Sequence, residues 1–91
     1  MTVEKIVTKH PQGKRGLNIE LKKYEMMKKS ILQILRHKEL THTELFDHLI
    51  KKLNGKFSGN VSWYGETVKL DLEARKIIER TSSKPAKYRI I

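Results

Sequence analysis

The chain has 91 residues, no cysteine and a formal net charge of +10, with 37% hydrophobic and 33% charged residues. This length fits one domain with a compact core, and it leaves little room for a large enzyme cleft. The lack of cysteine excludes a disulfide framework and a Cys-type zinc site. There is no apolar run near the roughly 20 residues of a membrane span, and no signal-peptide pattern. We therefore expect a folded cytoplasmic protein.

The positive charge is concentrated in the N-terminal part of the chain. Residues 1–38 hold ten Lys and Arg against three Asp and Glu, a net +7, whereas residues 39–91 hold ten against seven, a net +3. Such an excess favours polyanionic partners, because a Lys or Arg placed on a phosphate releases condensed counterions. The composition thus favours a nucleic acid as partner and indicates no membrane, small-molecule substrate or cofactor.

Residues 1–19 are predicted to form a basic N-terminal arm or loop. Regular structure is interrupted there by Pro11, Gly13 and Gly16. The basic residues of this segment include Lys9, Lys14 and Arg15. Basic arms can lie along a nucleic-acid backbone, although a run of charge is more often a solvated surface.

Residues 20–91 are predicted to form one domain that begins with three helices. Apolar residues recur at three- and four-residue steps over about residues 20–36, which predicts the first helix. The second begins at Thr41, whose spacing to Glu44 is that of a capping box, and ends at Asn54-Gly55. Over about residues 61–75 the apolar side chains fall within one narrow helical arc, which predicts the third.

Two β-rich segments follow the third predicted helix. Residues 76–81 and 87–91 are rich in β-branched side chains and are separated by a turn over residues 82–86. An isolated hairpin would be marginally stable, so we expect this one to pack on the helices. The expected fold is α+β and mainly α: a winged helix-turn-helix with three helices, a two-stranded wing and an N-terminal arm.

The end of the third helix and the wing carry a recognisable motif. Residues 68–80, with Val68, Leu72-Glu73, Ile77-Ile78 and Arg80 at fixed spacing, and Tyr88-x-Ile90 resemble the winged-helix transcription regulators of bacteria and archaea. Regulators of this type usually carry Gly where this chain has Lys76, at the left-handed position that ends the helix. We expect Lys76 either to accept some strain or to end the helix differently.

A second resemblance extends into the arm. It rests on His10-Pro11-x-Gly13-Lys14, Gly59-x-x-x-Trp63-Tyr64 and residues 68–75. Together these segments resemble a family of small, stand-alone bacterial winged-helix proteins of unknown function. The resemblance implies the fold but brings no known activity.

In a DNA-binding winged helix, the exposed side of the third helix enters the major groove and reads base edges. On this chain that side is expected to carry Ser62, Glu66, Lys69 and Glu73. Two carboxylates match a phosphate-walled groove poorly, although Glu can accept a hydrogen bond from cytosine N4. A solvated surface or a protein contact is the alternative for this helix.

The hairpin supplies a second set of predicted nucleic-acid contacts. Its cations are Arg80, Lys84, Lys87 and Arg89, which can track phosphates or a minor groove. Alternatively, they discourage edge-to-edge aggregation of a short strand. Lys14 and Arg15 of the arm complete the predicted set, and four lysines of the first helix can join them: Lys22, Lys23, Lys28 and Lys29.

The second hypothesis is a protein-interaction or dimerisation module without DNA binding. Trp63 and Leu70 lie seven residues apart beside the core arc of the third helix, where they can form an apolar stripe for a partner or second subunit. Core packing is the alternative. On the first helix, Tyr24, Met26 and Met27 raise the same choice, so a homodimer stays open.

The sequence shows no pattern typical of catalysis. Its four histidines form no i,i+4 metal pair, and Gly13-Lys14 lacks the spacing of a P-loop. Ser82 and Ser83 lie in a turn without a sequence cue for a base or an oxyanion site. We expect a protein without enzyme activity, metal or cofactor.

Overall fold

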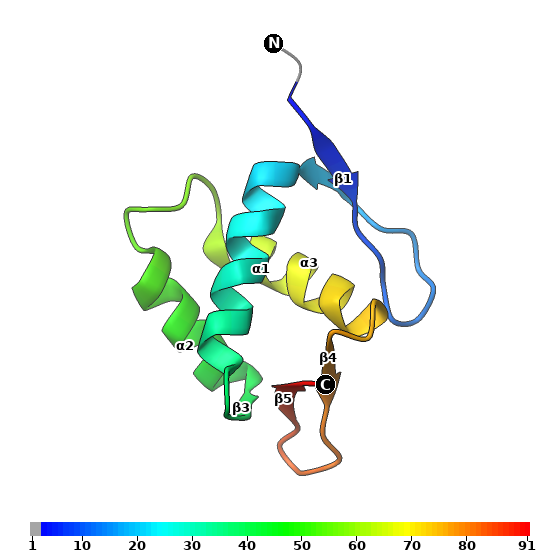
Figure 1. Ribbon diagram of the computed structural model, residues 1–91, viewed down its shortest axis with the longest axis vertical. Helices are drawn as coiled ribbons and strands as arrows, with labels where there is room; N and C mark the ends of the chain where they lie inside the picture. Colours follow the sequence, from blue (N-terminus) through cyan, green and yellow to red (C-terminus); the bar gives the residue numbers. More distant parts are fainter. Residues whose placement is uncertain (1–2) are drawn as a thin grey trace.

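The computed structural model describes residues 3–91 as a cluster of three helices with a small sheet at each end (Figure 1). The helices are α1 (Leu21–Leu35), α2 (His42–Leu53) and α3 (Val61–Ala74). One sheet is the antiparallel pair β1 (Lys5–Val7) and β2 (Asn18–Glu20). The other consists of β3 (Leu40–Thr41), β4 (Ile78–Arg80) and β5 (Lys87–Ile90), in the order β3-β5-β4. The fold is thus α+β, as expected. No helix in residues 3–91 is long and apolar enough to cross a membrane.

The three predicted helices are confirmed, with ends within about one residue of those expected. Thr41 forms the predicted capping box: its Oγ1 accepts from the Glu44 N–H at 3.2 Å, and its own N–H donates to Glu44 Oε1 at 2.9 Å. The start of α3 is capped by Asn60, whose Oδ1 accepts from the Trp63 N–H at 2.9 Å. These caps satisfy N–H groups that would otherwise lack a partner.

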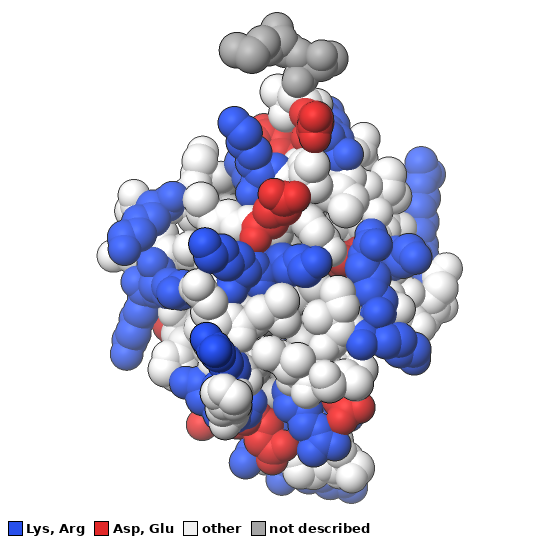
Figure 2. Space-filling model, viewed as in Figure 1, with Lys and Arg blue, Asp and Glu red and all other residues white. Residues whose placement is uncertain are grey.

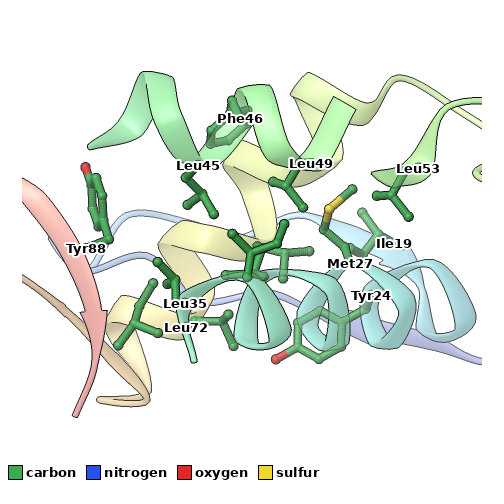
Figure 3. Close-up of a cluster of buried hydrophobic side chains, with 14 residues drawn as sticks. Ile19, Tyr24, Met27, Leu35, Leu45, Phe46, Leu49, Leu53, Leu72 and Tyr88 are labelled. Atoms are coloured by element: carbon green, nitrogen blue, oxygen red, sulfur yellow. The ribbon is translucent and has the colours of Figure 1, made fainter. Parts of the chain in front are cut away.

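The hydrophobic core lies where the three helices meet (Figure 3). Its fully buried residues include Met27 and Ile31 of α1, Leu45 and Leu49 of α2, and Val68 and Leu72 of α3. Gly65 allows α2 and α3 to approach closely, because a Cβ there would lie 2.9 Å from the Phe46 ring. The core fixes which side of α3 faces outward.

The hairpin of β4 and β5 packs on the helices as expected, through Ile78 and Tyr88, which are 1% and 5% exposed. The sequence did not reveal β3, which pairs with β5 in the register Leu40↔Tyr88. A two-residue strand that ends at the helix cap, Thr41, has no periodicity of its own. It ties the start of α2 to the hairpin.

Within residues 1–19, predicted as an arm or loop, the sequence did not reveal two short strands, β1 and β2, which pair in the register Ile6↔Ile19. Three-residue strands separated by a loop with Pro and Gly are too short to show alternation. Buried Ile19 anchors the hairpin to the core, and residues 8–17 form a loop, here called the arm loop. Residues 1–2 of the predicted arm lie outside the described part.

The helix end at Lys76 resolves the alternatives that the sequence left open. Lys76 has a φ of 63°, and the Ile77 N–H donates to the Leu72 carbonyl at 3.0 Å, as in a Schellman motif. The lysine thus accepts the strained left-handed conformation.

Because glycine adopts that conformation freely, Lys76→Gly is expected to raise the free energy of unfolding by about 0.5–1 kcal/mol, measured by urea denaturation. Lys76→Ala, which keeps the Cβ, is the control and should bring no comparable gain. A glycine variant less stable than the alanine variant would contradict strain at this residue.

Candidate nucleic-acid interface

Helix α3 lies between the arm loop and the β4–β5 hairpin. Val68 and Leu72 point into the core, Ser62 and Trp63 at its start are exposed, and the Glu66 side chain is partly exposed. Beyond them, Thr67 and Leu70 face the arm loop. The part of α3 that is open to a large partner is therefore its first half.

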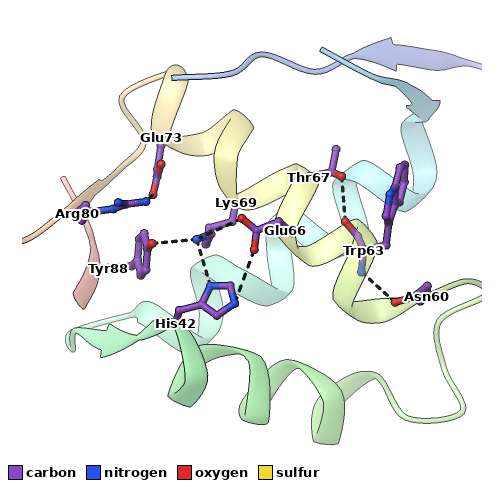
Figure 4. Close-up of polar contacts among 9 residues, drawn as sticks. All are labelled: His42, Asn60, Trp63, Glu66, Thr67, Lys69, Glu73, Arg80 and Tyr88. Carbon is purple, nitrogen blue, oxygen red and sulfur yellow. Dashed lines mark hydrogen bonds and ion pairs between the residues drawn. The ribbon is translucent and has the colours of Figure 1, made fainter. Parts of the chain in front are cut away.

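Lys69 does not lie on the outward side of α3, so the prediction that placed it there with Ser62, Glu66 and Glu73 was wrong. Its side chain is 2% exposed, and Nζ donates to the Tyr88 hydroxyl at 2.9 Å and lies 3.2 Å from Nδ1 of His42 (Figure 4). Strand β5 and the start of α2 close over the amine. Helical periodicity alone does not reveal such cover by distant segments.

The two carboxylates on this side of α3 have cations of the same chain beside them. Glu66 remains 45% exposed and lies 3.7 Å from both the Lys69 amine and His42 Nε2. Glu73 is 11% exposed, contrary to the expectation of an open position, and its Oε1 lies 3.9 Å from Arg80 without a hydrogen bond. The negative charge of these two carboxylates disfavoured binding of α3 in a DNA groove. Neighbouring cations of the same chain partly offset this charge.

His42 gives this cluster a pH dependence. Burial first, and then the charge of Lys69, hold the pKa of His42 below its usual range, against the opposing effect of Glu66. Its place in the first turn of α2 also disfavours a cation. A depressed pKa means that folding favours the neutral ring, which contributes stability above the unfolded pKa of about 6.5.

We expect this contribution to be lost as the pH falls through the folded pKa of His42. The wild-type melting temperature should therefore drop more steeply between about pH 7 and pH 5 than that of His42→Gln, measured by circular dichroism. His48→Gln is the control for removal of an exposed histidine and should follow the wild-type curve. Identical pH curves for wild type and His42→Gln would contradict this role.

The predicted cluster of four hairpin cations is divided between the two faces of the hairpin, because side chains alternate along a strand. Arg80 lies on the Tyr88 side, 5.4 Å from that ring. Arg89 lies on the other side, where Nε donates to Glu79 at 2.7 Å and Nη1 lies 3.6 Å from Glu39. Of the four, Lys84 and Lys87 form no ion pair within residues 3–91, and Lys84 is exposed in the turn.

The arm loop presents Lys14 and Arg15 to solvent, and neither forms an ion pair in the described part of the chain. The loop is held to α3 by Asp71, whose Oδ1 accepts from the Lys9 N–H at 2.8 Å. The loop that carries these two cations is therefore tied to α3.

Asp71, at 0% exposure, is the residue of this region that sequence reasoning missed. It also accepts hydrogen bonds from the Tyr24 hydroxyl and from Arg75 Nε, the latter at 2.9 Å. Burial, and then the hydrogen bond to Asp71, raise the pKa of Tyr24. An aspartate beside the apolar arc of an amphipathic helix was the available signal.

Basic residues also cover the side of the molecule on which α1 lies. Figure 2 shows Lys and Arg across this face, including the edge where Figure 1 places the arm loop. Lys22 and Lys29 of α1 are exposed, and neither forms an ion pair within residues 3–91. This α1 face is the alternative binding surface for a polyanion, in place of the cations around α3.

The predicted apolar stripe of Trp63 and Leu70 is interrupted. Trp63 is 45% exposed and packs edge-on against Tyr64, with ring centroids 4.8 Å apart. Leu70 is half-buried and lines a cavity with the arm loop. Only Trp63 remains as a large exposed apolar side chain on α3.

The comparison with protein families gives a match over residues 5–88 to a family of unknown function (DUF6958). The chain belongs to this family. The matched range begins at the first residue of β1 and so spans the arm hairpin as well as the three helices of this chain. No curated protein and no solved structure matches it.

Proposed function

We propose that residues 20–91 of this DUF6958 protein form a winged helix that binds double-stranded DNA. Three packed helices followed by a hairpin that packs on them agree with the winged-helix resemblance. The strand β3, just before α2, extends the hairpin into a three-stranded sheet. The net charge of +10 supports a polyanionic partner.

The proposal rests on the positions of the unpaired cations around α3. Lys14 and Arg15 stand on one side of the helix and Lys84 on the hairpin on the other, all exposed and without an ion pair in residues 3–91. Between them, Glu66 has the Lys69 amine and His42 as neighbours. Phosphates on both sides of a groove fit this arrangement.

In the proposed complex the first half of α3, with Ser62 and Glu66, faces the groove. Lys14, Arg15 and Lys84 contact phosphates, and Arg80 and Lys87 lie close to the same backbone. The buried Lys69 amine donates a hydrogen bond to the Tyr88 hydroxyl, and Arg89 remains bound to Glu79. Most of the affinity then comes from phosphate contacts, with weak preference for sequence.

A salt titration tests the proposal. Binding to a mixed-sequence duplex is measured by fluorescence anisotropy between roughly 50 and 200 mM salt. Three phosphate contacts predict a log-linear loss of affinity with a slope of about −2.7 or steeper. Absence of binding at the low end of this range would contradict the proposal.

The exposure of Trp63 supports a second candidate function, a contact with a partner protein or a second copy of the chain. It predicts that wild type self-associates or binds a partner and that Trp63→Ala abolishes this without loss of fold. Sedimentation velocity that shows monomers for both forms would contradict the dimer.

A further inference from the structure

A cavity of about 190 Å³ lies between the arm loop and α3. The arm loop contributes Thr8, Lys9, His10, Arg15, Gly16 and Leu17, and α3 contributes Thr67 and Leu70. The lining thus combines a lysine and an arginine with the apolar residues Leu17 and Leu70. The DNA-binding proposal uses Arg15 at the rim, but neither it nor the family match assigns a ligand to this space.

The backbone around the cavity is held by close contacts. The Thr8 N–H donates to the Leu17 carbonyl at 2.8 Å, and the Leu17 N–H donates to Thr8 Oγ1 at 2.9 Å. Gly16 packs so tightly that a Cβ would lie 1.5 Å from the Thr8 carbonyl oxygen. The Lys9 N–H is bound to buried Asp71 on the other wall. The loop and α3 therefore form a preorganised site.

The motif His10-Pro11-x-Gly13-Lys14 shapes the tip of this loop. Nδ1 of His10 accepts a hydrogen bond from the Gln12 N–H at 3.1 Å, and the His10 carbonyl accepts one from the Gly13 N–H at 3.0 Å. Gly13 has a φ of 72°, which favours glycine. The turn returns the chain so that Lys9 and Arg15 border the same cavity.

We propose that this cavity binds a small phosphate monoester with a compact apolar group. At neutral pH a phosphate monoester carries close to two negative charges, which match Lys9 and Arg15, and arginine binds phosphate oxygens in a bidentate manner. Leu17 and Leu70 contact the apolar group. The volume is below the 300–1,000 Å³ of pockets for drug-sized ligands, so the ligand is smaller than these.

A ligand in this position joins the arm loop to α3 and stabilises the folded arm. The effect follows mass action, since only the folded chain has the cavity. The site shares Arg15 with the proposed DNA contacts, but its occupancy is measured without DNA. Failure of either proposal is therefore distinguishable from failure of the other.

The test is an NMR titration of the ¹⁵N-labelled full chain with phenyl phosphate, in parallel with inorganic phosphate and with phenol. Phenyl phosphate is expected to give saturable shifts at the amides of Arg15, Gly16 and Leu70, with a Kd of about 1 mM or tighter. Phenol and inorganic phosphate should each bind at least tenfold more weakly, because each lacks one of the two contacts.

Two charge variants complete the experiment. Arg15→Gln, at an exposed position where loss of fold is not expected, should weaken phenyl phosphate binding at least tenfold, whereas Lys51→Gln on α2 should leave it unchanged. Unaltered binding by Arg15→Gln would overturn the proposal. So would equal affinity for inorganic and phenyl phosphate, or non-saturable shifts spread over the lysines of α1, which would show attraction to the general surface charge.

Discussion

Asp71→Ala is expected to lower the free energy of unfolding by about 3 kcal/mol, measured by urea denaturation. The carboxylate is fully buried and accepts from the Tyr24 hydroxyl, the Lys9 N–H and Arg75 Nε. Without it, the buried Tyr24 hydroxyl lacks its acceptor and the arm loop loses its hydrogen bond to α3. For a domain of typical stability, this is a large fraction of the total.

Two variants separate the contacts of Asp71. Tyr24→Phe removes one donor and leaves the carboxylate with two partners, so the expected loss is only about 1 kcal/mol. Hydrogen exchange at the Lys9 amide should accelerate in Asp71→Ala at denaturant concentrations where the core is intact, but not in Tyr24→Phe. Equal stability of Asp71→Ala and wild type would show that Asp71 does not hold the arm.

The double variant Lys14→Gln/Arg15→Gln is expected to weaken binding to duplexes of every sequence. Loss of two phosphate contacts should make the salt slope shallower by about 1.8. The matched control is Lys51→Gln/Lys52→Gln, an equal loss of charge at exposed positions in the last turn of α2. If both double variants show the same decrease in the salt slope, net charge and not the arm determines DNA binding.

The sequence was sufficient to predict the elements that depend on local signals. The capping box of Thr41 and Glu44, the Asn54-Gly55 stop and the apolar arcs place all three helices close to their observed ends. The short strands β1, β2 and β3 could not be predicted in this way, because pairing between distant segments of two or three residues leaves no periodic pattern.

The candidate site was harder to predict, because it depends on which distant segments cover α3. Helical periodicity placed Lys69 next to Ser62 on the outward side, but Tyr88 and His42 bury its amine. Spacing along the hairpin grouped Arg80 with Arg89, although strand alternation separates them. The exposure of Lys14, Arg15 and Lys84 agreed with the prediction, since loops and turns lie at the surface.

The most direct test of DNA binding around α3 is a map of amide shifts in the ¹⁵N-labelled protein on addition of a mixed-sequence duplex. We expect the shifts to concentrate in three segments: the arm loop, residues 60–66 at the start of α3, and the turn at Lys84. Shifts confined to the exposed lysines of α1, or spread evenly over the surface, would contradict it.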